Sequence, residues 1–250
     1  MISDRLRGAT RKVLKPGYYG QVQMGTLFYD GSELAVPTKP WASDVDLDGQ
    51  GNGNIPDRQG TNMNGYAIGS TSSNPDNVLT WHMFVDDKQY LYICDRCLVR
   101  TSWDHMNASS LVTGKKMIVD GKRYWCRILT GGVGQRAGTV GTASYGGGFI
   151  DNEWHRYILN EADVGDPVFV DAPTPEAADY NVTSDVSAAR RSAAHNQAWN
   201  WAKMGTWVQD VYAYTNTQRA IRGNLSARYW KVETSSVDTT VCGWRPVLIL

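Results

Sequence analysis

The chain has 250 residues, and its 25 lysine plus arginine residues are balanced by 25 aspartate plus glutamate residues, so its formal net charge is zero. A neutral chain creates no long-range field that would attract nucleic acid or an anionic membrane, which argues against a dedicated nucleic-acid-binding protein. No run approaches the roughly 18 to 20 apolar residues of a membrane helix, so no membrane insertion is expected. The 10 tryptophans, 13 tyrosines and 25 glycines suit short strands and shaped loops that carry flat amphipathic side chains.

The amino-terminal part is expected to be the least regular. Met1 to Val13 has the pattern of a short basic amphipathic helix, which predicts an arm or attachment segment. Tyr18 to Tyr29 alternates loosely and predicts the first strand, ended by Asp30-Gly31. Ser32 to Asn77 is rich in Gly, Asn, Asp, Ser and Pro, and so long an irregular segment is usually functional, mobile or ordered by an ion.

Two hairpins are predicted in the middle of the chain. Val78 to Val85 and Tyr90 to Val99 have strand patterns and are joined by a short polar turn. Met117 to Val119 and Arg123 to Leu129 flank Asp120-Gly121, a pair that tolerates the positive φ angles of a tight hairpin turn.

Two helices are predicted. Thr101 or Ser102 can cap a short helix through Asn107, with an aspartate in the first turn where the helix dipole favours a negative charge. Pro173 to Met204 contains the one sizeable helical pattern, which Gly205 would end.

The carboxyl-terminal segments return to strand character. Tyr229 to Glu233 and Val241 to Leu250 are predicted to be strands. Because the last four residues contain no polar side chain, the final strand should be central and buried.

A metal site is predicted on the irregular segment. Asp44, Asp46 and Asp48 stand at alternate positions before a glycine, which is how a loop places oxygen ligands around calcium. The bidentate glutamate of an EF-hand is missing from the expected position, so Asp57 or a nearby asparagine would have to complete the shell. Calcium is therefore a candidate cofactor, and a solvated acidic loop is the alternative.

The four cysteines do not form a clear metal site. Cys94 and Cys97 have the spacing of a zinc or redox pair, but Cys126 and Cys242 stand alone. If Tyr90 to Val99 is a strand, Cys94 and Cys97 lie on opposite faces, which favours two small buried side chains. The histidines are scattered, and no serine or cysteine lies in a recognisable nucleophile motif.

Two further groups of residues suggest ligand binding. Asp151 and Glu153 beside Trp154 resemble a sugar-cleaving carboxylate pair, although two nearby acids are more often surface groups. Seven aromatic residues in the last quarter are candidates for stacking on sugar rings or packing against a neighbouring protein, while more than half are expected in the core. They are Trp199, Trp201, Trp207, Tyr212, Tyr214, Tyr229 and Trp230.

Several segments carry a family resemblance. The closing Cys242 to Leu248 resembles the glycine-aromatic-arginine signature that ends many C-type-lectin-like domains, a class that includes phage tropism determinants and formylglycine-generating enzymes. Further segments resemble virion proteins of phages and prophages of Gram-positive bacteria: Tyr92 to Arg96, Trp103 to Asn107, Gly121 to Gly132 and Asn152 to Tyr157. The paired cysteines of the copper-dependent enzyme branch cannot be placed here, so its activity is not carried over.

The resemblance implies an α+β, C-type-lectin-like fold with small antiparallel sheets, long irregular loops and one or two helices. It divides the chain into residues 1–77, an arm with an attachment or calcium loop region, and residues 78–250, the lectin-like domain. The expected role is a non-enzymatic virion protein that binds a host-surface glycan or protein. The alternative is a capsid or tail decoration protein. Other virion proteins are expected partners, Arg245 is expected to stabilise the fold, and a homo-oligomer is expected because virion parts are usually symmetric.

Overall fold

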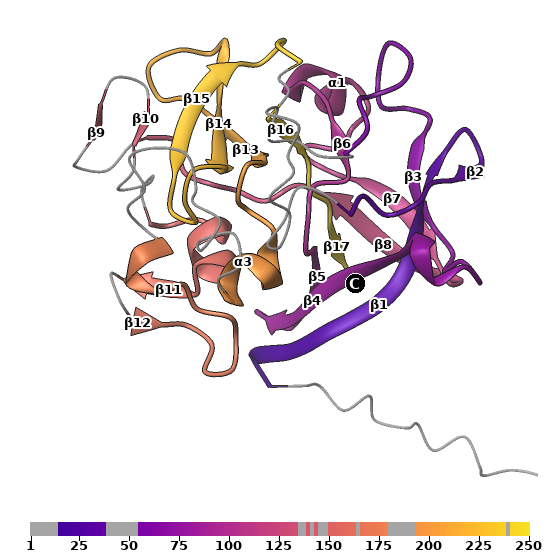
Figure 1. Ribbon diagram of the computed structural model, residues 1–250, viewed down its shortest axis with the longest axis horizontal. Helices are drawn as coiled ribbons and strands as arrows, with labels where there is room; N and C mark the ends of the chain where they lie inside the picture. The colour runs from indigo at the N-terminus through magenta and orange to yellow at the C-terminus, as the bar shows by residue number, and fades with distance from the viewer. Residues whose placement is uncertain are drawn as a thin grey trace, which may run out of the picture.

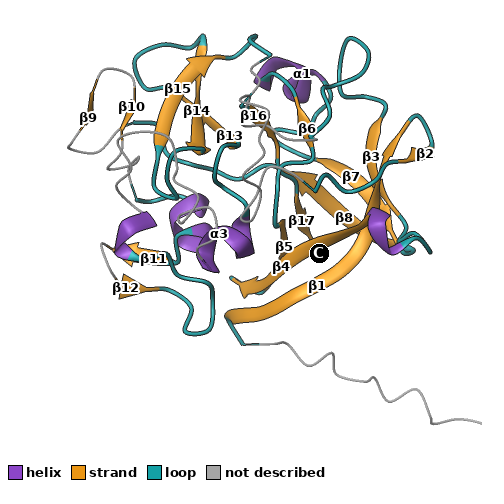
Figure 2. Ribbon diagram, viewed as in Figure 1, coloured by secondary structure: helices purple, strands orange, loops and turns teal. Residues whose placement is uncertain are grey.

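The computed structural model describes residues 15–38, 55–134, 139–140, 143–144, 150–163, 166–179, 194–238 and 241–250. The predicted arm, the Asp44 to Asp48 loop and residues 180–193 of the helical pattern between Pro173 and Met204 lie outside these residues. Within them the fold is mostly β, with two curled sheets and few helices, as Figures 1 and 2 show. No helix in the described ranges is long and apolar enough to cross a membrane.

The first sheet has eight strands in the order β2-β1-β4-β5-β17-β8-β7, and β3 also pairs with β1. Their bounds are β1 Gly17–Tyr29, β2 Ser32–Glu33, β3 Tyr66–Gly69, β4 Val78–Asp86, β5 Gln89–Cys94, β7 Lys115–Val119, β8 Lys122–Arg127 and β17 Val247–Ile249. All of the pairs in this sheet are antiparallel. Strand β17 lies between β5 and β8 with Val247 and Leu248 fully buried, which confirms the predicted central strand.

The second sheet has seven strands in the order β6-β16-β13-β14-β15-β10-β9. Their bounds are β6 Val99–Arg100, β9 Thr139–Val140, β10 Ala143–Ser144, β13 Gly205–Val211, β14 Gln218–Gly223, β15 Trp230–Thr234 and β16 Cys242–Trp244. The β13–β16 pair is parallel. A separate hairpin joins β11 (Glu161–Asp163) and β12 (Asp166–Pro167). The sheets are thus larger than expected, because strands distant in sequence join each of them.

Strand pairing also crosses the expected division of the chain. Strand β1 pairs with β4 from Gly17 to Thr26 and with β3 from Thr26 to Tyr29. Residues on both sides of the boundary between 77 and 78 therefore share one sheet. One cluster of buried side chains likewise combines Leu27 and Tyr66 with Trp244.

The local turn chemistry of the two hairpins is as predicted. Asp87 and Lys88 have φ of 42° and 65° between β4 and β5, and Asp120 and Gly121 have φ of 49° and 74° between β7 and β8. Two successive positive φ angles give a turn whose twist matches that of the flanking strands. The first hairpin is shorter than predicted, since β5 ends at Cys94.

The helices are short. They are η1 Pro75–Asn77, α1 Trp103–Ala108, η2 Trp154–Ile158 (a π-helix), η3 Ala177–Asp179 and α3 Ala194–Trp199. The side chain of Ser102 accepts a hydrogen bond from the backbone N–H of His105, which confirms the predicted cap of α1. The prediction that a helix continues to Met204 is wrong, because Asn200 and Lys203 have positive φ angles. The Asn196 side chain accepts from the N–H of Ala202, and this bond holds the chain in its turn after α3.

Candidate functional site

The predicted metal ligands do not form a site in the described part of the chain. Asp44, Asp46 and Asp48 lie outside the described residues. Asp57 forms an ion pair with Arg100 at 2.9 Å, so its carboxylate is bound by a protein cation. Within the described ranges, no three His, Cys, Asp or Glu side chains come together in a way that could hold a metal ion.

The cysteines are four buried free thiols. Cys94 packs in the cluster with Trp81 and Trp244, whereas Cys97 packs with Ile55 and Met204. The prediction of two small buried side chains in separate surroundings is therefore confirmed. Burial also raises the pKa of each of these two thiols, which opposes the reactive thiolate form.

The structure corrects most of the predicted aromatic surface. Five of the seven residues are buried in the interior and cannot contact a ligand: Trp199, Trp201, Trp207, Tyr229 and Trp230. Their large apolar area stabilises the core, as expected for more than half of the set. Tyr214 is 81% exposed, and its ring lies 5.2 Å from that of the half-buried Tyr212, which packs in turn against Trp230.

One arrangement that the sequence did not indicate combines Ser102, His105 and Asp238. The Ser102 hydroxyl lies 2.7 Å from Nδ1 of His105, and Asp238 lies 3.3 Å from the same nitrogen. A catalytic triad needs the serine and the carboxylate on different ring nitrogens, so that one orients the base for the other. Ser102 is also fully buried as a helix cap. This cluster therefore connects α1 to the segment after β15 and lacks the geometry of a nucleophile.

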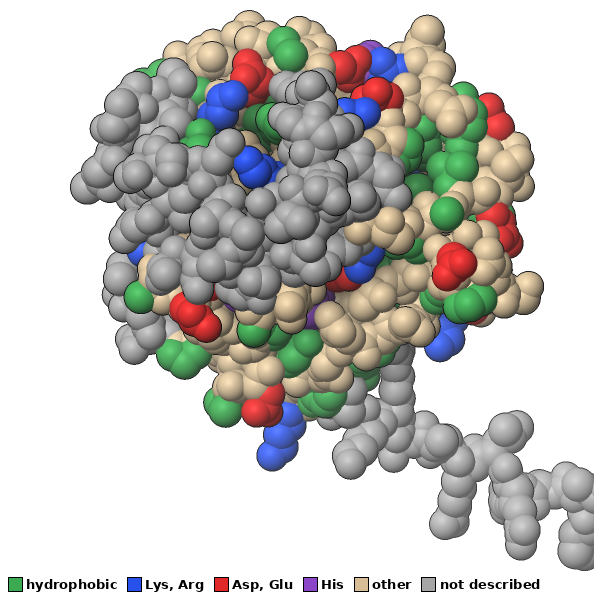
Figure 3. Space-filling view, viewed as in Figure 1, with side chains coloured by type: hydrophobic (Ala, Val, Ile, Leu, Met, Phe, Trp, Pro, Cys, Tyr) green, Lys and Arg blue, Asp and Glu red, His purple; other side chains and the backbone are tan. Residues whose placement is uncertain are grey.

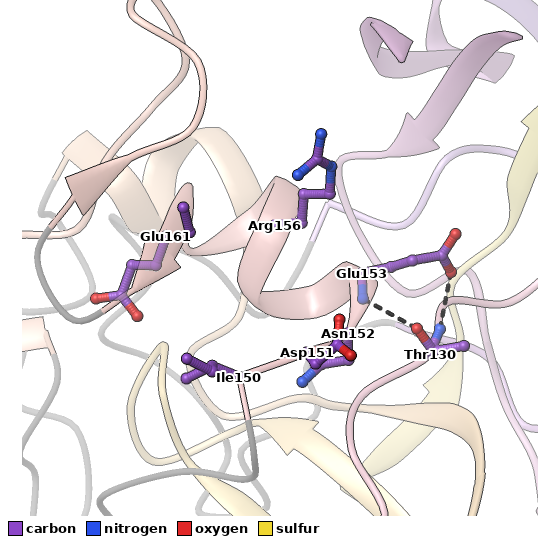
Figure 4. Close-up of a pocket in the computed structure, with 8 residues that line it drawn as sticks. Thr130, Ile150, Asp151, Asn152, Glu153, Arg156 and Glu161 are labelled. Atoms are coloured by element: carbon purple, nitrogen blue, oxygen red, sulfur yellow. Dashed lines mark hydrogen bonds between the residues drawn. The ribbon is translucent and has the colours of Figure 1, made fainter. Parts of the chain in front are cut away.

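A polar pocket of about 500 Å³ opens beside the start of η2. This volume lies within the range of small-ligand sites. The lining residues, most of them labelled in Figure 4, are Thr130, Ile150, Asp151, Asn152, Glu153, Arg156, Glu161 and Ala162. They come from the segment after β8, from the start of η2 and from β11. The sequence placed Asp151 and Glu153 together but gave no sign of Thr130 or Glu161.

Local hydrogen bonds fix the start of η2 against the segment after β8. The backbone N–H of Glu153 donates to the Thr130 hydroxyl at 2.9 Å, and the N–H of Thr130 donates to the Glu153 carboxylate at 2.9 Å. Both bonds are drawn in Figure 4. The N–H of Trp154 donates to the carbonyl of Thr130 at 3.0 Å. Asn152 accepts from the N–H of His155, which satisfies another donor at this helix end.

Three ion pairs border the pocket. Arg127 contacts both carboxylate oxygens of Glu153. Arg156 contacts both oxygens of Asp86. Burial would raise the pKa of Asp86, but hydrogen bonds from Arg156 and from the Tyr157 hydroxyl hold it below its usual value. The third pair joins Arg228 to one oxygen of Glu161 at 2.5 Å.

The carboxylates of the pocket differ in what they can still bind. Glu153 accepts from Arg127 and from the Thr130 backbone, so both of its oxygens are occupied. This arrangement disfavours the sugar-cleaving pair, in which an acid must reach the leaving group. Glu161 is only 3% exposed, and among the described residues its Oε2 has no hydrogen-bond partner. Asp151 is exposed on the same pocket wall. Two carboxylates thus have acceptor capacity left for a ligand.

Comparison of the chain with protein-family models, with curated proteins and with solved structures found no match. The resemblance to lectin-like virion proteins therefore stays a prediction.

Proposed function

We propose that the protein is a non-enzymatic recognition module of a phage-type particle and that its pocket beside η2 binds a glycan of the host surface. The observation that carries the proposal is the unpartnered Oε2 of the buried Glu161 in the pocket wall. A buried acceptor without a donor is costly, and a ligand that supplies the donor recovers that free energy.

A sugar matches the groups that the pocket offers. Each hydroxyl both donates and accepts, so it can donate to Glu161 or Asp151 while it accepts from an N–H of Arg156. The ion pairs of Arg228 with Glu161 and of Arg156 with Asp86 hold two of these groups in place before the ligand arrives. Such preorganisation reduces the entropy lost on binding. The proposed lectin-like class is compatible with the β-rich fold and rests on the sequence resemblance.

The proposal is tested by replacing Asp151 with asparagine. This change removes the charge of an acceptor at nearly constant shape, and we expect about a tenfold weaker affinity for wall glycans, in line with the worth of one charged hydrogen bond. Affinity is measured by isothermal titration with isolated bacterial wall polysaccharides, after a glycan array has identified those that bind. Glu161→Gln should weaken binding further.

The matched control is Asp87→Asn, the same chemical change at an exposed turn between β4 and β5. It should bind like the wild type. Equal affinities for Asp151→Asn, Asp87→Asn and the wild type, or no binding to any wall glycan, would reject the proposed pocket.

A second candidate function is attachment to a neighbouring virion subunit as a decoration protein. It is favoured by Tyr214, which is 81% exposed and whose ring contacts that of Tyr212. We expect Tyr214→Ser to lower the amount of protein retained on purified particles at least severalfold, because exposed aromatic side chains often dominate interface energies. Retention is measured by quantitative gel analysis of washed particles. Unchanged retention of Tyr214→Ser would exclude this contact. As a control, the Tyr214→Ser variant and the wild type should have the same glycan affinity.

A further inference from the structure

The β7–β8 hairpin carries an exposed aromatic surface that the proposed pocket does not include. Strand alternation directs Met117, Val119, Tyr124 and Cys126 into the core and leaves their neighbours outside. The outward residues are Lys116, Ile118, Arg123 and Trp125. We call these four residues the hairpin surface. Ile118 is 60% exposed and Trp125 is 44% exposed.

The indole of Trp125 is held in a fixed position. Its Nε1 donates to the carbonyl of Thr113 at 3.2 Å. The ring lies against Gly114, where a Cβ would overlap the indole nitrogen, and Gly114 has a φ of +124°. One side of the ring is thus covered by backbone while a large part remains accessible. A rigid, accessible aromatic ring is a stacking platform that loses little conformational entropy on binding.

Basic side chains surround this platform. Lys116 stands directly opposite Trp125 across the two strands, and Arg123 stands opposite Ile118. Within the described part of the chain, neither of these two cations forms an ion pair. The one acid of the hairpin, Asp120, is bound by the backbone N–H and the hydroxyl of Thr71 at 2.8 and 2.7 Å.

This local charge contrasts with the rest of the molecule. The whole chain is neutral, and on the face seen in Figure 3 the coloured basic and acidic side chains are scattered among polar ones. Lys116 and Arg123, on the same face as Trp125, therefore form a local positive surface in a neutral protein. Such a surface attracts anions at short range, and salt screens the attraction.

The hairpin surface continues toward the pocket. Arg123, Trp125 and Arg127 follow each other on the same face of β8, because they alternate along the strand. Arg127 contacts Glu153 in the pocket wall. Two residues of a strand span about 7 Å, so Trp125 lies roughly one sugar unit from the residue that borders the pocket.

We propose that the hairpin surface binds an anionic polysaccharide, with a sugar ring stacked on Trp125 and the phosphate or carboxylate groups bound by Lys116 and Arg123. The same polymer chain reaches the pocket beside η2, and in this respect the inference rests on the proposed function. It specifies the class of glycan: charged and polymeric. The Trp125 indole is held against the backbone of Thr113 and Gly114, a position that suits stacking better than insertion into a lipid bilayer.

The experiment measures the affinity of the full chain for four probes by biolayer interferometry at about 50 and 300 mM salt. The probes are poly(glycerol phosphate), polygalacturonate, neutral dextran and single-stranded DNA. The inference predicts that at least one of the first two binds about tenfold or more tightly than dextran and DNA, and that the higher salt weakens this binding severalfold. The better of these two polymers identifies phosphate or carboxylate as the recognised anion.

Two variants test the residues. Trp125→Ala should weaken binding about tenfold, whereas Tyr214→Ala, which removes an exposed aromatic elsewhere, should leave it unchanged. The double variant Lys116→Gln with Arg123→Gln should weaken binding and reduce its salt dependence. Its control, Lys15→Gln with Lys88→Gln, removes the same charge from exposed sites outside the hairpin.

The outcomes separate this inference from the proposed function. If Asp151→Asn weakens glycan binding while Trp125→Ala does not, glycan binding by the pocket is supported and glycan binding by the hairpin surface is rejected. If dextran binds as tightly as the anionic polymers, or DNA binds more tightly, the proposed specificity for an anionic polysaccharide is overturned. If the Trp125 variant has wild-type thermal stability and unchanged affinity for every probe, the stacking platform is overturned.

Discussion

Arg245→Met is expected to lower the free energy of unfolding by about 4 kcal/mol, one of the two largest effects that we predict for a change in this protein. Arg245 is fully buried between β16 and β17. Its guanidinium donates to the carbonyl of Trp199 at 2.7 Å, to the Thr206 hydroxyl at 3.0 Å and to the carbonyl of Cys94 at 3.2 Å. Methionine fills much of the volume but leaves these buried acceptors without donors.

Arg245 has this effect because it joins elements from both sheets. Thr206 belongs to β13 of the second sheet, Cys94 ends β5 of the first, and Trp199 ends α3. The prediction is checked by urea unfolding at neutral pH, followed by far-ultraviolet circular dichroism. The control is Arg123→Met on the exposed face of β8, which should change stability by no more than about 0.5 kcal/mol. A loss below 1 kcal/mol in the Arg245 variant would contradict the role assigned to its hydrogen bonds.

The sequence predicted those parts of the fold that depend on short-range patterns. The turn at Asp120-Gly121, the cap at Ser102 and the apolar final strand follow from residues adjacent in the chain, and each is present. The role of Arg245 as a structural residue is also confirmed. The turn, the cap and the final strand share one property: the atoms that decide them lie within a few residues of each other or in an uninterrupted apolar run.

The sequence could not predict the residues that long-range contacts place together. Whether an aromatic side chain such as Trp207 or Tyr214 is buried depends on which strands pair, and composition does not settle this. Glu153 is held by Arg127, 26 positions away, and Glu161 by Arg228, 67 positions away. Trp125 was not singled out from the sequence, although alternation from the hairpin turn could have indicated its exposure.

The second large effect is a loss of stability in mild acid. His82 and His195 are both buried, and burial lowers their pKa values to about 4 and about 3. The unfolded chain, with histidine pKa values near 6.5, therefore binds more protons than the folded chain in this range. The contribution of these two histidines to the free energy of unfolding is fully present above about pH 6.5 and is lost as the pH decreases. By pH 4 the loss should be on the order of 3 kcal/mol for each histidine.

The hydrogen bonds of His195 explain why its neutral form is so strongly favoured. Its Nε2 lies 2.7 Å from the carbonyl of Ile158 and must donate, so Nδ1 accepts from the indole N–H of Trp201 at 2.9 Å. A proton on Nδ1 would face that N–H donor. In His82, Nδ1 lies 2.9 Å from the hydroxyl of Tyr18, which can reverse its role and accept. Protonation of His195 should therefore be the more disruptive of the two.

A comparison of His195→Gln with the wild type isolates this contribution. Glutamine does not titrate, so the variant should be less stable than the wild type at pH 7 but should lose about 3 kcal/mol less between pH 7 and pH 4. Urea unfolding at four pH values measures how the free energy of unfolding of each protein changes with pH. Carboxylates with lowered pKa, such as Asp86 and Asp238, add the same slope to both proteins and cancel in the comparison. His105→Gln, at a partly exposed site beside Asp238, is the control. If the His195 variant had the wild-type slope, protonation of this buried imidazole would not be what destabilises the fold in acid.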